Sequence, residues 1–233
     1  HIGDSLLNLY TVGKLSGLTE VLFIERCIRL LKPGGRLGIV LPEGVLNNTN
    51  LQTVRELFEG MAKIILITSI PQDVFMASGA TVKPSLLFFK KFTNEERAQF
   101  DAIKQAATEE VDAKYQSQLD EIDSFLAERR NPAEEKKAKR AERRALETKI
   151  AAEIWAIVKE KFDYTIPIAQ VEKAGITTTG AECENELIDL LKEFTPYRKE
   201  HNMWTSNELK FHYEIVDNKV VRTDQNGNTK ELC

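Results

Sequence analysis

The sequence predicts an α/β protein whose body is followed by a long helical hairpin. Two observations support this prediction. Short apolar runs alternate with segments of helical periodicity over residues 18–92, and a densely charged stretch with helical spacing follows from residue 95. Within the first region, a helical pattern at residues 19–31 leads through a sharp turn into an apolar run at residues 37–41. This order of helix, turn and buried strand is typical of an α/β sheet.

The helix at residues 19–31 has recognisable start and stop signals. Thr19 is the expected N-cap, and Glu20 suits the first turn, where the helix dipole favours negative charge. Lys32 suits the negative end of the helix, and a proline and two glycines then terminate it. The run at residues 37–41 is expected to be a strand buried on both faces, as in a parallel sheet under helices.

Further elements of the same kind are expected up to residue 92. Residues 2–17 are expected to be a loop, with a small helical turn at Leu6, Leu7 and Leu9 as the alternative. Beyond the first strand we expect a polar loop at residues 43–50, a short helix at 51–58, a strand at 64–67, a loop at 71–80 and a last strand at 85–92.

The composition changes abruptly at Thr93. Apolar residues keep steps of three and four from Phe100 to Leu126 and again from Leu146 to Val158, and a break at residues 131–132 separates the two stretches. We therefore expect two antiparallel helices, a hairpin that projects from the α/β body.

The remaining residues predict a small mixed α+β region. It has a short helix at residues 185–194 and a β-hairpin of residues 211–216 and 219–223. The predicted domains are residues 1–93, 94–162 and 163–233.

Composition and charge exclude several classes of protein. The net charge of −4 excludes a protein that is basic throughout, so any contact with DNA needs a local patch or a partner. The three cysteines lie far apart without CxxC spacing, which favours a reducing compartment and argues against a disulfide framework or a zinc site. No apolar run is long enough to span a membrane, and no signal peptide is evident. We expect a cytoplasmic protein with neither a metal site nor a membrane partner.

Two stretches resemble a known enzyme family. LLKPGGRLGIVLP (residues 30–42) resembles the passage from helix to fifth strand in S-adenosylmethionine-dependent methyltransferases. Its continuation PEGVLNN, and then SIPQDVFMASGATVKPSLLFFKK (residues 69–91), is similar to the modification (M) subunit of type I restriction systems, a DNA adenine methyltransferase. The resemblance covers residues 15–91 well and residues 162–191 more loosely.

This resemblance implies a fold, a cofactor and partners. The fold would be the C-terminal half of a class I (Rossmann-like) methyltransferase sheet, with a final strand that runs antiparallel. The cofactor would be S-adenosyl-L-methionine, and the partners would be double-stranded DNA, a specificity (S) subunit and a restriction (R) subunit. Within such a complex, the hairpin and the C-terminal region would contact the specificity subunit or DNA.

The catalytic motifs of the resembled family are missing from the sequence. The family uses a glycine-rich turn to admit the cofactor, and an Asn-Pro-Pro-Phe or Asn-Pro-Pro-Tyr loop to bind the amino group of adenine. No such turn follows a strand, and the only Asn-Pro is Asn131-Pro132, between charged stretches. Because the sequence also opens on His1 rather than methionine, we expect a fragment of an enzyme that is inactive alone.

Two aromatic residues match site residues of the resembled family and are therefore candidate site residues here. Phe23 matches an aromatic residue that leans on the adenine ring of the cofactor; the alternative is a core residue of an amphipathic helix. Phe75 matches a loop aromatic that stacks on the flipped target base, since chemistry on a base requires its extrusion from the duplex. The alternative for Phe75 is an anchor that holds the loop to the sheet. Glu43, just after a strand, faces either a ligand cleft or solvent.

The only dense basic cluster lies at residues 136–144. It predicts either a helix that contacts phosphates or a solvated face whose charge is balanced by neighbouring glutamates. The candidate nucleic-acid contacts in this cluster are Lys136, Lys137, Arg140, Arg143 and Arg144.

The leading hypothesis is therefore part of an enzyme that moves a methyl group from S-adenosylmethionine to N6 of adenine in duplex DNA. Two alternatives remain open. One is a non-catalytic assembly module built on a degenerate methyltransferase half. The other is a class I methyltransferase with an RNA or small-molecule substrate, since the LKPGG turn is shared widely.

Overall fold

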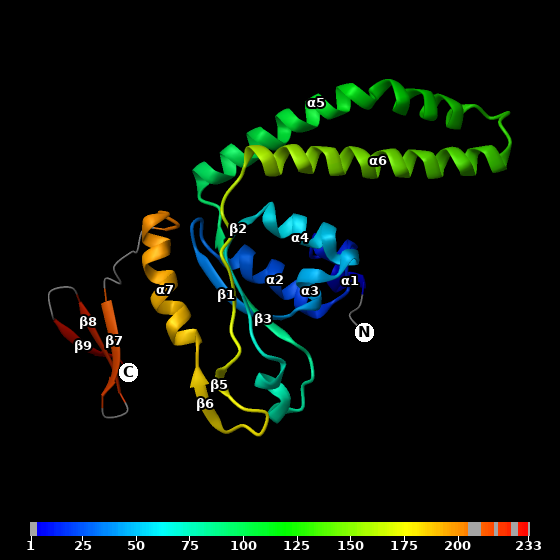
Figure 1. Ribbon diagram of the computed structural model, residues 1–233. Coiled ribbons are helices and arrows are strands. Elements are labelled where there is room, and N and C mark those ends of the chain that lie inside the picture. The colour runs from blue at the N-terminus through cyan, green and yellow to red at the C-terminus, as the bar shows by residue number, and fades with distance from the viewer. Residues whose placement is uncertain (1–3, 205–210, 217–218, 225–227, 233) are drawn as a thin grey trace. The chain divides into compact units, whose positions relative to one another are not determined.

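The structure is a computed structural model that describes residues 4–204, 211–216, 219–224 and 228–232 (Figure 1). The chain divides into two compact units, His1–Glu184 and Asn185–Cys233. The first unit contains the sheet and the helical hairpin. The three-domain division at residues 93 and 162 stays a prediction.

The first unit is built on a four-stranded mixed sheet in the order β1-β3-β2-β4. The strands are β1 (Arg36–Pro42), β2 (Ala62–Ser69), β3 (Pro84–Lys91) and β4 (Ile168–Gln170). Strand β3 runs antiparallel to both β1 and β2, whereas β4 pairs parallel with β2. The expected strands at residues 64–67 and 85–92 are thus confirmed, and so is the antiparallel direction of the last one.

The expectation that the first strand is buried on both faces is wrong. Leu37, Ile39 and Leu41 belong to the core, but Val40 on the opposite face is 47% exposed. Helices cover one face of β1, and in the described sheet its only neighbour is β3. A continuous apolar run does not show which of its two faces is covered, because that depends on the packing of distant elements.

Helices and short helical turns precede β1 or connect the first three strands of this sheet. They are α1 (Asp4–Leu7), η1 (Val12–Lys14), α2 (Thr19–Leu30), α3 (Gly44–Asn47), η2 (Thr49–Leu51), α4 (Gln52–Glu59) and η3 (Gln72–Ser78). Helices α2 and α4 confirm two expected helices. The segments expected to be loops at residues 2–17, 43–50 and 71–80 each contain short helical turns, and α1 lies where a small turn was the alternative. The predicted N-cap is also wrong, since Leu18 takes that position and makes no side-chain cap.

The end of α2 is capped by a residue far along the chain. The ammonium group of Lys91, at the end of β3, donates hydrogen bonds to the carbonyl oxygens of Leu31 (2.6 Å) and Arg29 (3.2 Å). Gly34 adopts a positive φ of 73° in the turn between α2 and β1, and its N–H donates to the carbonyl of Lys91. These contacts place the C-terminus of α2 beside the first residues of β1, so the helix runs back along the strand.

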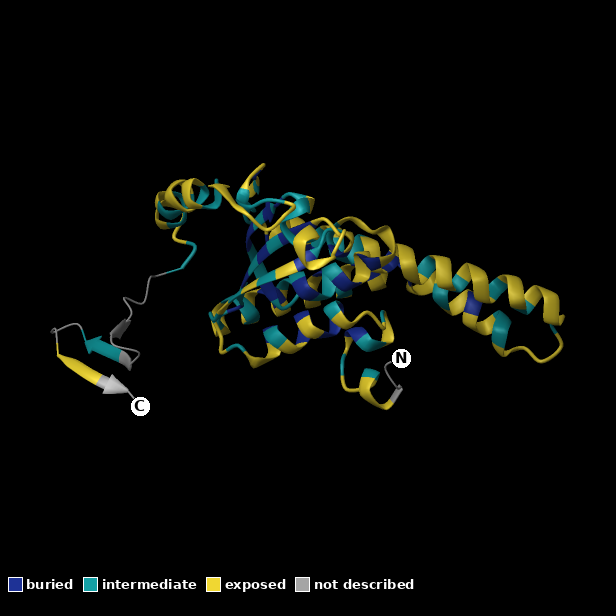
Figure 2. Cartoon of the chain, turned by 90° about the horizontal axis from the view of Figure 1, so that it is seen from below, coloured by how far each residue is buried: buried dark blue, intermediate teal, exposed yellow. Residues whose placement is uncertain are grey.

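The charged region forms the expected pair of helices, α5 (Asn94–Ala127) and α6 (Ala133–Lys161). Figure 2 shows that most of their surface is exposed. The buried residues of the pair pack together in two small clusters, and they include Ala107, Val111 and Tyr115 of α5, and Ile150 and Val158 of α6. Thr93 and Glu96 form a capping box at the start of α5.

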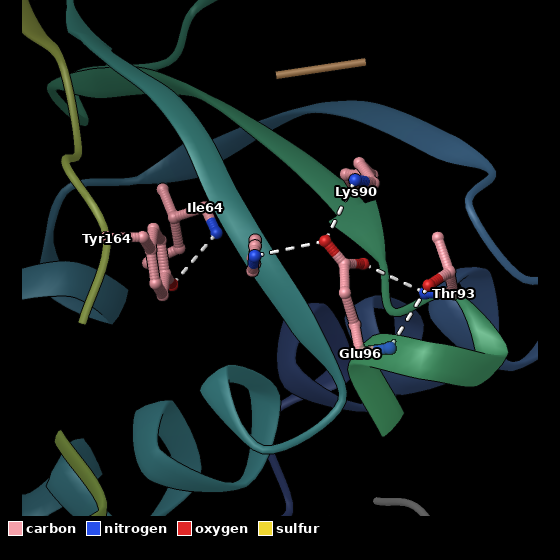
Figure 3. Close-up of polar contacts among 6 residues, drawn as sticks. Ile64, Lys90, Thr93, Glu96 and Tyr164 are labelled. Atoms are coloured by element: carbon pink, nitrogen blue, oxygen red, sulfur yellow. Dashed lines mark hydrogen bonds and ion pairs between the residues drawn. The ribbon is translucent and has the colours of Figure 1, made fainter. Parts of the chain in front are cut away.

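An aromatic cluster joins the hairpin to the sheet. The ring centroids of Phe92, Phe100 and Phe162 lie 5.3 Å from one another in all three pairs. Nearby, the hydroxyl of Tyr164 accepts a hydrogen bond from the N–H of Ile64 in β2 at 3.2 Å (Figure 3). Burial raises the pKa of Tyr164 to about 12. The hairpin is therefore rooted in the sheet by packed rings and by polar contacts.

Two small strands and the second unit complete the described chain. Strands β5 (Ala174–Ile176) and β6 (Glu182–Asn185) pair with each other. The second unit has a helix, α7 (Leu187–Glu200), and an antiparallel sheet of β7 (Phe211–Val216), β8 (Lys219–Asp224) and β9 (Thr229–Leu232).

These elements agree only in part with the sequence-based expectations. The pairing of β7 with β8 confirms the expected β-hairpin, although its turn, Asp217-Asn218, lies outside the described residues. Helix α7 is longer than expected because it continues through Pro196, a residue that normally disfavours a helix interior.

Cys27 and Cys183 are free thiols, and Cys233 lies outside the described residues. Among the residues that the structure describes, no helix is long and apolar enough to cross a membrane. Within the same residues, His, Cys, Asp and Glu side chains form no group of three that could hold a metal ion.

Candidate functional site

The segments that carry the candidate site residues Glu43 and Phe75 lie at one edge of the sheet. Strands β1 and β2 are both antiparallel to β3, and β4 is parallel to β2, so β1, β2 and β4 all point the same way. Their carboxyl ends therefore share an edge, where Glu43 follows β1 and η3 follows β2. Because α2 runs back along β1, its first turns lie toward the same edge. Open α/β sheets bind ligands at the carboxyl ends of their strands.

Phe23 lies in the second turn of α2 and is 59% exposed. The interpretation of Phe23 as a core residue is therefore wrong, and the neighbouring Leu22 is buried instead. Phe23 lines a cleft of about 280 Å³. The other lining residues come from α1, α2 and the segment between them: Leu6, Tyr10, Thr19, Leu22 and Arg26.

We call this cleft the Phe23 cleft, and its lining is mainly apolar. Two aromatic rings and two leucines provide an apolar surface, and the polar groups of the lining residues are the hydroxyls of Tyr10 and Thr19 and the guanidinium of Arg26. Ligand sites typically combine such an apolar lining with a few polar groups. The volume is below the usual range for a complete drug-sized ligand, so the cleft suits one ring system rather than a whole nucleoside cofactor.

Helix α2 also carries a buried acid that the sequence analysis missed. Glu25 of α2 is 0% exposed, and its two carboxylate oxygens accept hydrogen bonds from the N–H groups of Thr11 (3.0 Å) and Val12 (2.8 Å). Arg29, one turn further along α2, forms an ion pair with the same carboxylate. The signal in the sequence was an acid on the apolar stripe of a helix, between Val21 and Ile28.

Phe75 lies in η3, the short helical turn after β2, and its side chain is partly buried. The turn is closed by a hydrogen bond from the side chain of Gln72 to the carbonyl of Thr81, and by one from the N–H of Ala80 to the carbonyl of Phe75 (3.1 Å). Gly79 ends it with a positive φ of 80°. Partial burial is compatible with both interpretations of Phe75, as a base-stacking residue and as a loop anchor.

Two neighbours support the Phe75 loop. Strand β5 packs against η3, and a β-carbon at Gly180 would meet the side chain of Ala77 at 3.5 Å. Beside the loop, the carboxylate of Glu43 pairs with the ammonium of Lys83 at 3.4 Å, and the N–H of Glu43 donates to the carbonyl of Lys83 at 2.9 Å. Glu43 is thus held between the connections that follow β1 and precede β3.

The structure divides the basic cluster of α6 in two. Lys137, Arg140 and Arg144 are exposed and, at spacings of three and four residues, share one outer face of the helix. The other members are partly buried, and Arg143 pairs with Asp123 of α5 at 3.2 Å. Lys139 pairs with Glu142 of its own helix at 2.8 Å. Of the candidate contacts, Lys136 and Arg143 therefore lie apart from the exposed face.

The family model for N-6 DNA methylases matches residues 14–168, which cover strands β1, β2 and β3, the Phe23 helix and the hairpin. This chain belongs to the N-6 DNA methylase family. The match includes η3 and α6, so both candidate nucleic-acid segments lie within the family region. No curated protein matches the chain.

Two solved structures show local likeness to this N-6 DNA methylase family member. One, from Listeria monocytogenes, is described as a class I S-adenosylmethionine-dependent methyltransferase, with 24% identity and a TM-score of 0.36 over 40% of this chain and 29% of that chain. The other belongs to a type I restriction-modification system, with 29% identity and a TM-score of 0.35 over 39% of this chain and 18% of that chain. The chain thus spans less than a third of either protein, and the TM-scores are too low to support an argument.

Membership of the N-6 DNA methylase family implies S-adenosylmethionine as the cofactor. The residues of the Phe23 cleft fit one part of this molecule, its adenine ring, which Phe23, Tyr10 and Thr19 would hold. No acidic side chain lines the cleft to bind a ribose. When bound, the cofactor supplies an electrophilic methyl group.

Proposed function

We propose that this chain is the C-terminal part of the modification (M) subunit of a type I restriction-modification system. The complete enzyme would transfer a methyl group from S-adenosylmethionine to N6 of adenine in duplex DNA, in the cytoplasm. The observation that carries the proposal is the N-6 DNA methylase match across a sheet with an open aromatic cleft near its ligand-binding edge. The partners would be double-stranded DNA, the specificity subunit and the restriction subunit.

Two aromatic residues have distinct roles in this proposal. Phe23 rests on the adenine ring of the cofactor, and Phe75 stacks on the target base after it has flipped out of the duplex. The 233-residue sequence does not contain the Asn-Pro-Pro-Phe or Asn-Pro-Pro-Tyr loop that binds the amino group. In this proposal the chain alone is therefore inactive. The position of η3 supports the base-stacking role of Phe75, because the turn follows β2 at the carboxyl edge of the sheet.

We expect Phe75→Ala in the full-length protein to lower kcat/KM for DNA methylation roughly tenfold, because stacking a base on an aromatic ring contributes about 1–3 kcal/mol. Transfer of tritiated methyl groups from S-adenosylmethionine to duplex DNA measures the effect. Phe75→Tyr keeps an aromatic face and should retain activity, and Met76→Ala tests an exposed neighbour in the same turn. Full activity of Phe75→Ala would leave Phe75 as a loop anchor.

The exposed face of α6 provides a place for DNA phosphates. We expect the triple variant Lys137→Gln, Arg140→Gln, Arg144→Gln to weaken DNA binding and to flatten its dependence on salt. The slope of log affinity against log salt should fall by about 1 for each phosphate that the variant no longer binds. Fluorescence anisotropy with labelled duplex over a salt series measures this slope. Lys139→Gln, on the same helix but paired with Glu142, is the control and should leave the slope unchanged.

A non-catalytic assembly module is a second candidate. The observation that favours it is the hairpin, which is rooted firmly in the sheet while most of its surface stays exposed. The same methylation assay distinguishes the two functions. A full-length protein that assembles with its partner subunits but neither binds S-adenosylmethionine nor methylates DNA would support the module and exclude the enzyme.

A further inference from the structure

Glu25 is a fully buried acid that the proposed roles do not yet explain. Its carboxylate lies in the interior of the first unit, where it accepts hydrogen bonds from the backbone N–H groups of Thr11 and Val12. It also forms an ion pair with Arg29. An unpaired charge in such a place would be strongly destabilising, and this one is satisfied on both oxygens. A well-packed apolar side chain would often serve stability equally well. The two hydrogen bonds of the carboxylate instead indicate that it fixes the orientation of the backbone at Thr11 and Val12.

The backbone that Glu25 holds leads directly into the Phe23 cleft. Tyr10, which lines the cleft, immediately precedes Thr11. Val12 is fully buried and anchors the segment by packing, but packing alone does not fix the direction of the peptide groups before it. Two hydrogen bonds to adjacent N–H groups do fix that direction.

Arg29 strengthens the same arrangement. Its guanidinium pairs with Glu25 and also donates a hydrogen bond to the side-chain oxygen of Thr11 at 2.8 Å. Helix α2 carries both Glu25 and Arg29, which hold the segment, and the residues Phe23 and Arg26, which line the cleft. One helix thus carries one wall of the cleft and also holds the segment that forms the other wall.

We propose that Glu25 is a positioning residue for the Phe23 cleft. By holding the N–H groups of Thr11 and Val12, it sets Tyr10 across from Phe23, so that the cleft is already shaped for a purine ring before the ligand arrives. This inference rests on the proposed function, in which the ligand is the adenine ring of S-adenosylmethionine. Preformed sites bind more tightly because less ordering accompanies binding.

The test measures the affinity of S-adenosylhomocysteine for the full-length protein by isothermal titration calorimetry. Glu25→Gln keeps the shape of the side chain but removes its charge, and we expect roughly tenfold weaker binding. Glu20→Gln, on the same helix but outside the cleft lining, is the matched control and should bind like the wild type. Hydrogen exchange of the Thr11 and Val12 amides, measured without ligand, should be faster in Glu25→Gln.

A double-mutant cycle separates positioning from a general loss of stability. If Glu25 acts through Tyr10, Glu25→Gln should weaken binding by less than twofold in a protein that already carries Tyr10→Ala. If the two substitutions act independently, their fold-changes in affinity should multiply. Should Glu25→Gln fail to fold, Glu25→Asp keeps the negative charge beside Arg29 but shortens the reach of the carboxylate to the N–H groups of Thr11 and Val12. It should weaken binding severalfold, and wild-type affinity in that variant would overturn the inference.

The outcomes distinguish this inference from the proposed function. If the wild-type protein does not bind S-adenosylhomocysteine, the proposed function fails and the inference fails with it. If the wild type binds and Glu25→Gln binds equally well, or if the two substitutions act independently, the positioning role is overturned while the proposed function stands.

Discussion

Replacing Phe100 with alanine is expected to lower the free energy of unfolding by about 3–5 kcal/mol, the usual cost of removing a buried phenylalanine. Phe100 is 3% exposed, and its ring lies 5.3 Å from the rings of both Phe92 and Phe162. It also meets Trp155 of α6 edge-on at 6.2 Å. The substitution would thus leave a cavity where both hairpin helices meet the end of β3.

Urea unfolding followed by tryptophan fluorescence measures this loss, and Trp155 reports directly on the cluster. Phe125→Ala is the matched control, because Phe125 lies near the other end of α5 and outside the aromatic cluster. We expect its effect to be much smaller. Equal losses for the two variants would show that the cluster at the base of the hairpin has no special importance for stability.

The stability of this attachment between the hairpin and the sheet matters for function, because it determines whether binding to the hairpin can affect the sheet. A hairpin joined to the body by one flexible connection would transmit little to the sheet. Here α5 begins directly after β3, and Phe162 at the end of α6 packs on the same rings. A partner or a DNA duplex bound to the exposed face of α6 would therefore be held in a fixed relation to the sheet that carries Phe75.

Local patterns in the sequence were enough to predict most of the elements. Helical periodicity marked α2, α4, α5 and α6, and apolar runs marked β1, β2 and β3, because these signals depend on neighbouring residues. The exposed face of Val40 and the capping of α2 by Lys91 were not predictable in this way. Both depend on contacts between segments far apart in the chain.

The candidate site was predictable only in part. Adjacent apolar residues such as Leu22 and Phe23 give no indication of which one faces the core, and the cleft beside Phe23 depends on α1 and Tyr10. The division of the basic cluster, in contrast, did have a signal in the sequence. Ile150 marks the buried face of α6, and the helical repeat places Lys137 and Arg144 away from it.

Glu96→Gln is expected to destabilise the protein by about 2 kcal/mol at neutral pH, less than the 3–5 kcal/mol typical of a fully buried ion pair. The carboxylate of Glu96 pairs with the ammonium groups of Lys63 and Lys90, at 3.0 Å each. It also accepts the N–H of Thr93 at 2.9 Å, which closes the capping box (Figure 3). The side chains of Glu96 and Lys90 are 17% and 13% exposed, so losing the negative charge leaves a lysine poorly solvated.

The same contacts predict a dependence on pH. Burial tends to raise the pKa of Glu96, but the N–H of Thr93 and the two lysines outweigh it and hold the pKa below its ordinary value of 4.5. A carboxylate with a lowered pKa in the folded state stabilises the protein above the ordinary pKa, and the stabilisation is lost as the pH falls through the folded-state value. The wild-type protein should therefore lose this contribution below pH 4.5, and Glu96→Gln should lack that part of the decline.

Urea unfolding of both proteins, from neutral pH to well below pH 4.5, measures the difference, which should shrink as the pH falls. Glu109→Gln, an exposed position on the same helix, is the control and should follow the wild type within about 0.5 kcal/mol. A constant difference at every pH would mean that the charge of Glu96 does not contribute, and that the variant differs through hydrogen bonding such as that with Thr93. In that case, the lysines of β2 and β3 would contribute little to holding the hairpin, and the aromatic cluster would be its principal attachment.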